Sequence, residues 1–177
     1  WNRAITPSEV LALYEAAPAT VSGSVTYDGP VTGPTVIWAL APNGQLVAQR
    51  IIPPGDSNYS IDVPRGGSFD LKAFRDANGN QILNHLEGEP WGHLGDWNDT
   101  TNSFNLLLVD DNLDHANVHL HDHDSDGDGF LNHEEHQIGS APDNNNSFPV
   151  TITGHLEYGG PLDTSVVTRL SNASLVR

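Results

Sequence analysis

Carboxylates recur at a spacing typical of a calcium ligand set in the stretch Asp124-Ser125-Asp126-Gly127-Asp128-Gly129-Phe130-Leu131-Asn132-His133-Glu134-Glu135. Calcium takes six to eight oxygen ligands, and a 12-residue loop supplies them from positions 1, 3, 5, 7, 9 and 12 when glycine at position 6 permits the sharp turn. This stretch fills every position, with the predicted ligands Asp124, Asp126, Asp128, the Phe130 carbonyl, Asn132 and the bidentate Glu135. A solvated acidic linker would explain the charge, but not the glycine and glutamate at their places. We therefore predict calcium as the cofactor.

A second, weaker loop is predicted at Asp76-Ala77-Asn78-Gly79-Asn80-Gln81-Ile82-Leu83-Asn84-His85-Leu86-Glu87. Its predicted ligands are Asp76, Asn78, Asn80, the Ile82 carbonyl, Asn84 and Glu87. Gln81 stands where glycine is expected and only two ligands carry charge, so we expect lower affinity for calcium. Glu89 could replace Glu87 if the loop is two residues longer. The alternative is a turn held by asparagine side-chain hydrogen bonds.

Histidines are concentrated around the first loop. Residues 113–136 contain six of the nine, and on a strand His119, His121 and His123 would share one face, where they could bind zinc, nickel or copper. Solvent-facing positions beside buried neighbours explain the same alternation, and we favour that interpretation. His133-Glu134-Glu135-His136 does not have the spacing of the His-Glu-x-x-His zinc-protease motif.

The composition limits the partners. A formal net charge of −16 argues against nucleic acid and anionic membranes, which both attract basic surfaces. No apolar run reaches membrane-spanning length, and the absence of cysteine excludes disulfides. Because the chain also lacks methionine, we expect a processed piece of a longer product. Loops that rely on ambient calcium favour an extracellular or cell-surface location.

The elements that must position these loops are short strands separated by turns. Period-two segments are predicted at residues 20–27, 35–41, 46–52, 59–63, 68–75, 103–109 and 116–121, with turn motifs such as Pro42-Asn43-Gly44 between them. This pattern predicts an all-β antiparallel sandwich. Before it, Thr6, Pro7 and Glu9 predict a capped helix, and after the first loop Asn132 is expected to cap a short helix that stops at Gly139.

We divide the chain into an N-terminal helical segment (1–18), a sandwich (19–122), the calcium loop and linker (123–147), and further strands (148–177). The last segment begins with Ile152-Thr153-Gly154-His155-Leu156-Glu157-Tyr158-Gly159-Gly160-Pro161, which aligns with Val21-Ser22-Gly23-Ser24-Val25-Thr26-Tyr27-Asp28-Gly29-Pro30. Its strands are expected to pack on the first domain, to begin another domain, or to complete a neighbour by strand addition.

Three groups of residues resemble known families. The first group resembles the prealbumin-like, carboxypeptidase-regulatory-like branch of immunoglobulin-like sandwiches and consists of Val21–Tyr27, Tyr59–Pro64 and Phe69–Asp76. Members of that branch usually act as structural spacers. The second loop ends in Glu89-Pro90-Trp91-Gly92, which is similar to that family's Glu-Pro-x-Gly. Asp124–Pro142 resembles the acidic calcium repeats related to thrombospondin type 3 repeats, although Gly139-Ser140-Ala141-Pro142 lacks their final aspartate. Trp1–Val10 and Leu13-Tyr14 resemble the closing segment of laminin-G-like jelly-roll domains in secreted bacterial proteins. These resemblances imply an extracellular bacterial origin.

Four Asn-x-Ser/Thr motifs predict N-glycosylation, at Asn58, Asn98, Asn145 and Asn172. The first three have an aspartate two residues earlier, which matches the extended acceptor of one class of bacterial oligosaccharyltransferase. Covalent glycans are therefore among the expected partners.

No catalytic motif occurs in the sequence: it has no Gly-x-Ser-x-Gly elbow, no phosphate-binding glycine loop and no cysteine nucleophile. We therefore expect no enzyme but a calcium-binding, glycosylated structural subunit of an extracellular bacterial filament or surface assembly, joined by self-association or to neighbouring domains of the same protein. The alternative is a spacer or glycan-binding accessory module of a large secreted carbohydrate-active enzyme or adhesin, in which Trp91 and Trp97 stack on sugars.

Overall fold

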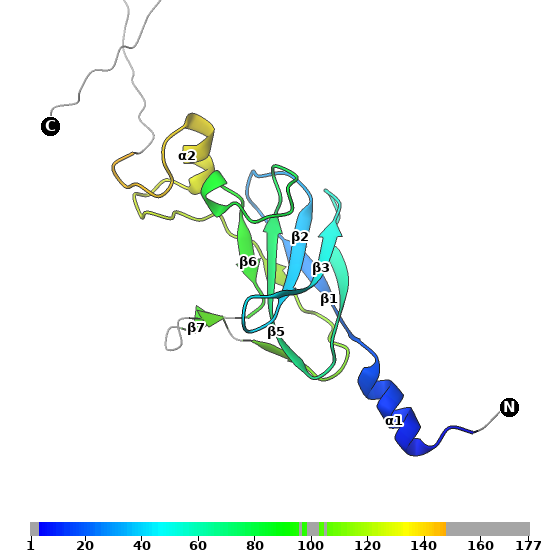
Figure 1. Cartoon of the computed structure of the whole chain (residues 1–177). Coiled ribbons are helices and arrows are strands. Elements are labelled where there is room, and N and C mark those ends of the chain that lie inside the picture. Colours follow the sequence, from blue (N-terminus) through cyan, green and yellow to red (C-terminus); the bar gives the residue numbers. More distant parts are fainter. Residues whose placement is uncertain (1–3, 96, 99–102, 105, 148–177) are drawn as a thin grey trace, which may run out of the picture.

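The computed structural model describes residues 4–147 except 96, 99–102 and 105. The strands predicted after Pro149 and the glycosylation motif at Asn172 lie outside the described residues. Two β-sheets pack as a sandwich, with α1 (Pro7–Ala16) before them and α2 (Asn132–Ile138) after them (Figure 1). No helix in this part of the chain is long and apolar enough to cross a membrane.

The smaller sheet has the order β10-β1-β4, formed by β10 (Val118–His119), β1 (Ala19–Thr26) and β4 (Asn58–Val63). The larger sheet has the order β3-β2-β5-β6, formed by β3 (Leu46–Ile52), β2 (Thr35–Leu40), β5 (Gly67–Arg75) and β6 (Trp91–His93), and β9 (Leu107–Val109) pairs with the start of β5. β7 (Trp97–Asn98) and β8 (Ser103–Phe104) form a separate hairpin. The pairings are antiparallel except for β1 with β10, which is parallel. The two-sheet sandwich is therefore as predicted, although β1 and β10 are parallel where an antiparallel sandwich was expected, and an immunoglobulin-like topology stays a prediction.

Alternating apolar side chains fill the space between the sheets. β4 shows the pattern most clearly, because Tyr59, Ile61 and Val63 are buried while the residues between them are exposed. β5 contributes Phe69, Leu71 and Ala73 from the other sheet, whereas Phe74 is buried outside this core and packs against Trp38. The Tyr59 hydroxyl donates to the Ala116 carbonyl, so this buried polar group is satisfied.

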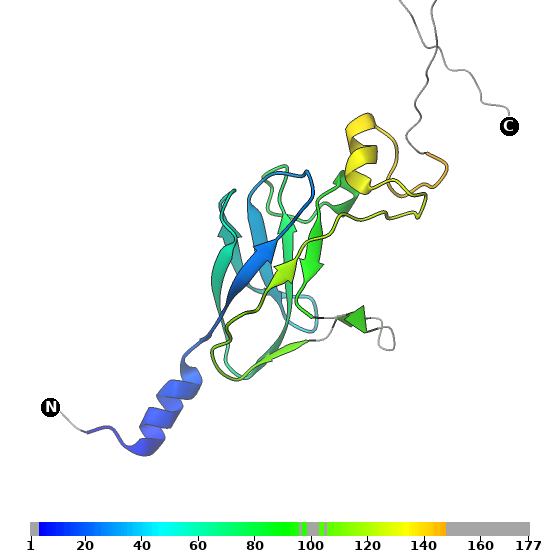
Figure 2. The same ribbon diagram turned by 180° about the vertical axis from the view of Figure 1, so that it is seen from behind.

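The sheets are joined by backbone hydrogen bonds along one side of the sandwich, whereas along the other, the open side, β3 and β4 lie close together without pairing. Trp91 and His121 exchange backbone hydrogen bonds of 3.2 and 3.1 Å, which joins β6 to the segment after β10. On the opposite side, β3 and β4 are the last strands of their sheets within the described residues. Figures 1 and 2 show β3 on the side away from α2.

The predicted strands agree with β1 to β5 to within about one residue at each end. The two later predictions were too long: residues 103–109 form β8 and β9 separately, and residues 116–121 contain only the two-residue β10. β6 was not predicted, because Trp91-Gly92-His93 is too short to show a period. Gly92 is required there, since an added Cβ would lie 2.1 Å from the His119 carbonyl oxygen.

α1 starts with the predicted capping box, in which Thr6 N donates to Glu9 Oε2 (2.8 Å) and Glu9 N donates to Thr6 Oγ1 (3.3 Å). The helix projects from the end of the sandwich opposite to α2 (Figures 1 and 2). Its apolar residues remain exposed, including Leu11 (55%) and Leu13 (63%). Arg65 holds it to the sandwich by donating to Tyr14 Oη at 2.8 Å.

Candidate metal centre

The loop 124–135 lies between the strand region and α2, and its aspartates organise its backbone. Asp124 accepts from Gly127 N (2.8 Å) and Gly129 N (3.0 Å). Asp126 Oδ1 accepts from Asp128 N at 3.2 Å, and Asp128 Oδ1 accepts from the N–H of the half-buried Phe130 at 2.9 Å. Gly127 and Gly129 have φ of 75° and 95°, which residues with a Cβ rarely adopt. These contacts turn the backbone so that the remaining carboxylate oxygens converge.

Asp124, Asp126 and Asp128 form a group that could hold a metal ion. One ligand atom from each lies within 4.8 Å of the other two, and they are the one such group of three or more among the described residues. Asp126 Oδ2 and Asp128 Oδ2 are buried and have no hydrogen-bond partner within the described structure. Asp126 and Asp128 thus each use one oxygen for the loop and leave the other for a cation, whereas both oxygens of Asp124 accept from loop N–H groups.

Glu135 lies near this group, in the first turns of α2, but is not one of its members. Its side chain is fully buried, and neither carboxylate oxygen has a hydrogen-bond partner in the described part of the chain. Burial and repulsion from Asp126, Asp128 and Asp124 raise the pKa of Glu135. Burial also acts on Asp124, but hydrogen bonds from the Gly129 and Gly127 N–H groups outweigh it and lower the pKa of that aspartate. A buried carboxylate without a donor is costly, and a divalent cation would supply the missing partner.

Asn132, at the ninth position, uses its side chain differently from the predicted ligand role. Its Oδ1 accepts from Ser125 N (2.9 Å), and its Nδ2 donates to Ser125 Oγ (2.8 Å) and to the His85 carbonyl (2.8 Å). Asn132 is also the first residue of α2 rather than its cap, which is Leu131. The buried amide therefore connects the first loop to the second.

The second loop repeats this backbone scheme. Asp76 is buried and accepts from Gly79 N (2.8 Å), Asn80 N (3.0 Å) and Gln81 N (3.0 Å). Asn78 Oδ1 accepts from Asn80 N (3.0 Å), as Asp126 does from Asp128, and Asn80 Oδ1 accepts from the N–H of Ile82 (2.7 Å). Gln81 takes the left-handed conformation of the sixth position, with φ of 61°, although it is not glycine. The sequence correctly placed a second turn of this kind.

The predicted oxygen ligands of this loop are close together but bond to one another. Asn78 Nδ2 donates to Asn84 Oδ1 (3.2 Å) and to the exposed Glu87 (2.9 Å), while Asn80 Nδ2 donates to Asn84 Oδ1 (2.6 Å). This is the arrangement expected of the alternative, a turn held by asparagine hydrogen bonds.

Glu89 rather than Glu87 is the buried glutamate of the second loop. Its carboxylate accepts from Ala77 N (2.9 Å) and Asn84 N (2.8 Å). Burial raises the pKa of Glu89 although these N–H groups act against it. The sequence pointed to this residue only as the substitute for Glu87.

The two loops pack against each other at one end of the sandwich. The 3-10 helix η1 (His85–Glu87) of the second loop contacts α2. Gly88 permits the approach, because an added Cβ would lie 2.3 Å from the His133 Cα. The two loops are therefore in direct contact.

The histidines alternate with buried residues, as the favoured interpretation holds. His119 and His121 are exposed beside the buried Val118 and Leu120. His119 Nδ1 lies 2.8 Å from Thr26 Oγ1, and the His123 ring stacks on Trp91 with centroids 4.3 Å apart. Lys72 Nζ also lies 4.7 Å from the centre of the Trp91 ring, so this tryptophan packs within the protein. The side chain of Trp97 lies outside the described residues.

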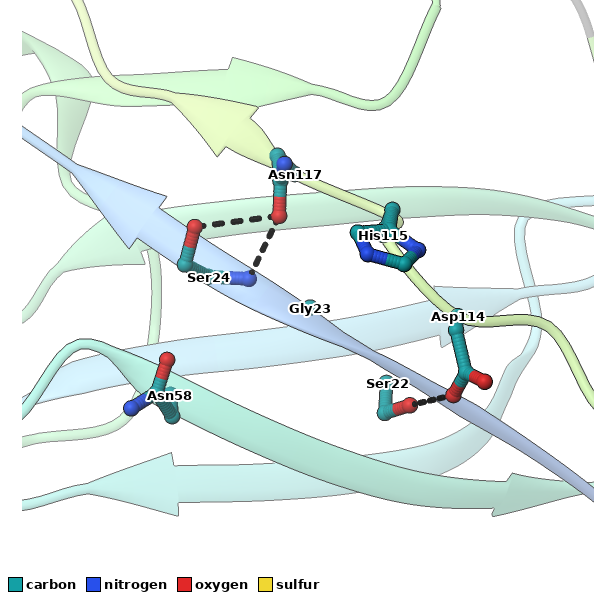
Figure 3. A pocket seen from close by; sticks show the side chains of 7 residues that line it. All are labelled: Ser22, Gly23, Ser24, Asn58, Asp114, His115 and Asn117. Atoms are coloured by element: carbon teal, nitrogen blue, oxygen red, sulfur yellow. Dashed lines mark hydrogen bonds between the residues drawn. The ribbon is translucent and has the colours of Figure 1, made fainter.

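A shallow polar groove of about 450 Å³ lies along β1 (Figure 3). Ser22 Oγ donates to Asp114 Oδ1 (2.6 Å), and Ser24 N and Oγ donate to Asn117 Oδ1 (2.9 and 3.0 Å). These contacts hold the segment before β10 against β1. Ser22 is paired with Asp114 and not with a histidine that could act as a base. Asn58, one of the glycosylation candidates, lines the groove from β4 and is exposed.

Comparison with known proteins adds no relative: no family model, curated protein or solved structure matches the chain significantly. The class defined by fold and site is therefore a sandwich-like β domain with an acidic cluster that could bind a metal ion. The resemblances to named families stay predictions.

Proposed function

We propose that this chain is a non-enzymatic, calcium-binding structural module of an extracellular assembly. The observation that carries the proposal is Glu135, a fully buried carboxylate with two unpartnered oxygens beside the aspartate cluster of the first loop. A buried anion in this position is explained by a bound cation, because carboxylates without partners are rarely buried.

Calcium is the cation that the donor set favours. All the available donors are oxygens, and hard oxygen ligands suit calcium and magnesium rather than zinc or copper. A loop with aspartates at positions 1, 3 and 5 and glutamate at position 12 has the flexible bidentate ligand that calcium accepts, whereas magnesium requires a tighter octahedron. The second loop would bind more weakly, since a cation there must displace the hydrogen bonds that its asparagines and Glu89 already make.

The ion would act as a structural joint. Without it, the first loop brings three aspartates together and places Glu135 near them, next to a helix that is only seven residues long. Calcium would neutralise their repulsion and fix α2, and through Asn132 also η1, against the end of the sandwich. Ion binding is therefore coupled to the order of this end of the molecule rather than to catalysis.

Isothermal titration with calcium tests the proposal on protein stripped with a chelator. Glu135→Gln should weaken calcium binding on the order of 100-fold, because a bidentate charged ligand is lost. Glu134→Gln is the matched control: Glu134 is exposed, and its Oε2 accepts from Leu131 N at 3.0 Å, which an amide oxygen can also do. Equal affinity in all three proteins, or tighter binding of magnesium than of calcium, would contradict the assignment.

Glycosylation is a separate part of the proposal. Asn58 and Asn145 are exposed, as an acceptor must be, and the side chains of Asn98 and Asn172 lie outside the described residues. Mass spectrometry of glycopeptides from native material should find glycans on asparagine-containing peptides of this set. Unmodified peptides at all four positions would refute it.

A further inference from the structure

The open side of the sandwich presents an edge strand that can accept another strand. Within the described residues β3 pairs only with β2, so alternate N–H and C=O groups along its outer edge have no ladder partner. Such an edge is a template for strand addition unless it is covered or protected. The opposite side is closed by the Trp91–His121 pair and does not offer this template.

β3 is the less protected of the two open edges. Its seven residues include a single charge, Arg50, and no proline, and Leu46, Val47 and Ile51 are 45%, 37% and 41% exposed. β4 instead begins at the glycosylation motif of Asn58 and carries Asp62. Charges and bulky glycans discourage edge pairing, so an added strand should choose β3.

The sequence of residues 150–156, Val-Thr-Ile-Thr-Gly-His-Leu, has the length and the alternating pattern of such a strand. From Ile152 on they align with β1, and in the structure β1 forms a six-residue antiparallel ladder with β4. We propose that residues 150–156 of one copy add as a strand to the β3 edge of a second copy. The inference rests on the proposed role as a structural module and names its partner.

The reach of the chain favours a second copy over the same molecule. Ser147 follows α2, which lies beyond the β6 side of the sandwich, whereas β3 lies on the far side (Figures 1 and 2). Three strand spacings separate β6 from β3, a distance of about 14 Å. The three residues from Ser147 to Val150 span at most about 10 Å.

The symmetry of this contact follows from the two surfaces involved. The donor segment and the acceptor edge are different parts of the chain, so the contact is heterologous. When the contact repeats from copy to copy it gives open filaments or rings, whereas reciprocal exchange between two copies gives a closed swapped dimer.

Peptide binding to the full chain tests the proposal without removing any part of the fold. The acceptor is the full-length Thr151→Pro, Ile152→Pro variant, which should not donate its own strand, and the probe is a labelled peptide of residues 150–156 followed by fluorescence anisotropy. Peptides with Thr151→Pro or Ile152→Pro alone should differ about tenfold in affinity, because only alternate N–H groups of an added strand face the acceptor. In ultracentrifugation, wild type should form concentration-dependent oligomers, and the double variant should be monomeric.

Edge variants locate the binding edge. Ile51→Lys on β3 should weaken peptide binding, whereas Ser60→Lys on the exposed face of β4 should leave it unchanged. Calcium affinity is measured for each variant as well. If calcium binding is normal but no peptide binds, this inference alone is overturned. If wild type binds no calcium, the proposed function alone is overturned. A wild-type monomer that binds no peptide, or peptide binding that only Ser60→Lys abolishes, would overturn the β3 assignment.

Discussion

The substitution Glu135→Gln should make the protein more stable than wild type without calcium and less stable than wild type with calcium. In the chelated protein Glu135→Gln should melt at a higher temperature than wild type, because the buried anion and its repulsion from the aspartates are removed. In calcium the order should change, since only the wild type keeps the bidentate ligand.

The size of the calcium effect follows from linkage. At a calcium concentration about 100 times Kd, binding stabilises the folded state by about 2.7 kcal/mol, and a roughly 100-fold weaker variant gains about 0.4 kcal/mol at the same concentration. For a domain of this length each kcal/mol raises Tm by about 2–4 °C, so wild type should gain about 5–10 °C and the variant about 1 °C. Scanning calorimetry in chelator and in calcium measures which protein has the higher Tm in each condition. The control Glu134→Gln should have the same Tm as wild type in both. A variant less stable than wild type in chelator would show that Glu135 has a structural partner and is not held for a cation.

Three further substitutions test the surrounding structure. Asn132→Ala removes the hydrogen bond to the His85 carbonyl and should cost about 1–3 kcal/mol, with faster hydrogen exchange in η1, whereas slow exchange there would mean that the loops are not coupled through this amide. Gln81→Gly should stabilise the protein by about 1 kcal/mol in denaturant unfolding, since a non-glycine residue at φ of 61° is strained, and an unchanged midpoint would contradict this. Thr6→Ala should lower helical circular dichroism by removing the cap of α1 while leaving the main melting transition unchanged, and a lower main Tm would show that α1 packs on the sandwich.

The sequence predicted the parts of the fold that depend on local patterns. β4 is recognisable because Tyr59, Ile61 and Val63 alternate with exposed residues, and α1 because its cap is formed by neighbours in the chain. β6 and β10 could not be predicted in this way, because they contain three and two residues and exist through long-range pairing with β5 and β1, beside the long-range contact of Trp91 with His121. Gly92 indicates that contact only after the strands are in place.

The first loop was predictable residue by residue, but its contact with the second loop was not. Spacing alone indicated Asp124, Asp126, Asp128 and Glu135. The three aspartates do converge in the described structure, and Glu135 is buried near them. Spacing assigned Asn132 to the ion as well, whereas its amide binds Ser125 and His85. The prediction for Asn132 differs from the observed contacts because its amide also has N–H donors, which a calcium ligand set does not use. The sequence does not show that the His85 carbonyl of η1 lies opposite these donors.

The pairing of the two loops bears on how a metal at one end could affect an assembly. The first loop has unpartnered carboxylate oxygens and would be ordered by an ion, whereas the second satisfies its own groups and holds its shape without one. Asn132 and the close approach of Gly88 to His133 join the two, so the self-sufficient loop provides a fixed surface against which the ion-dependent loop is set. Loss of calcium should then loosen α2 and the chain that follows Ser147 before it affects the sandwich core. If residues 150–156 bind a neighbouring copy, the ion would determine the direction in which that segment leaves the domain, and a chelator should alter the geometry of the assembly at concentrations that leave β1 to β5 folded.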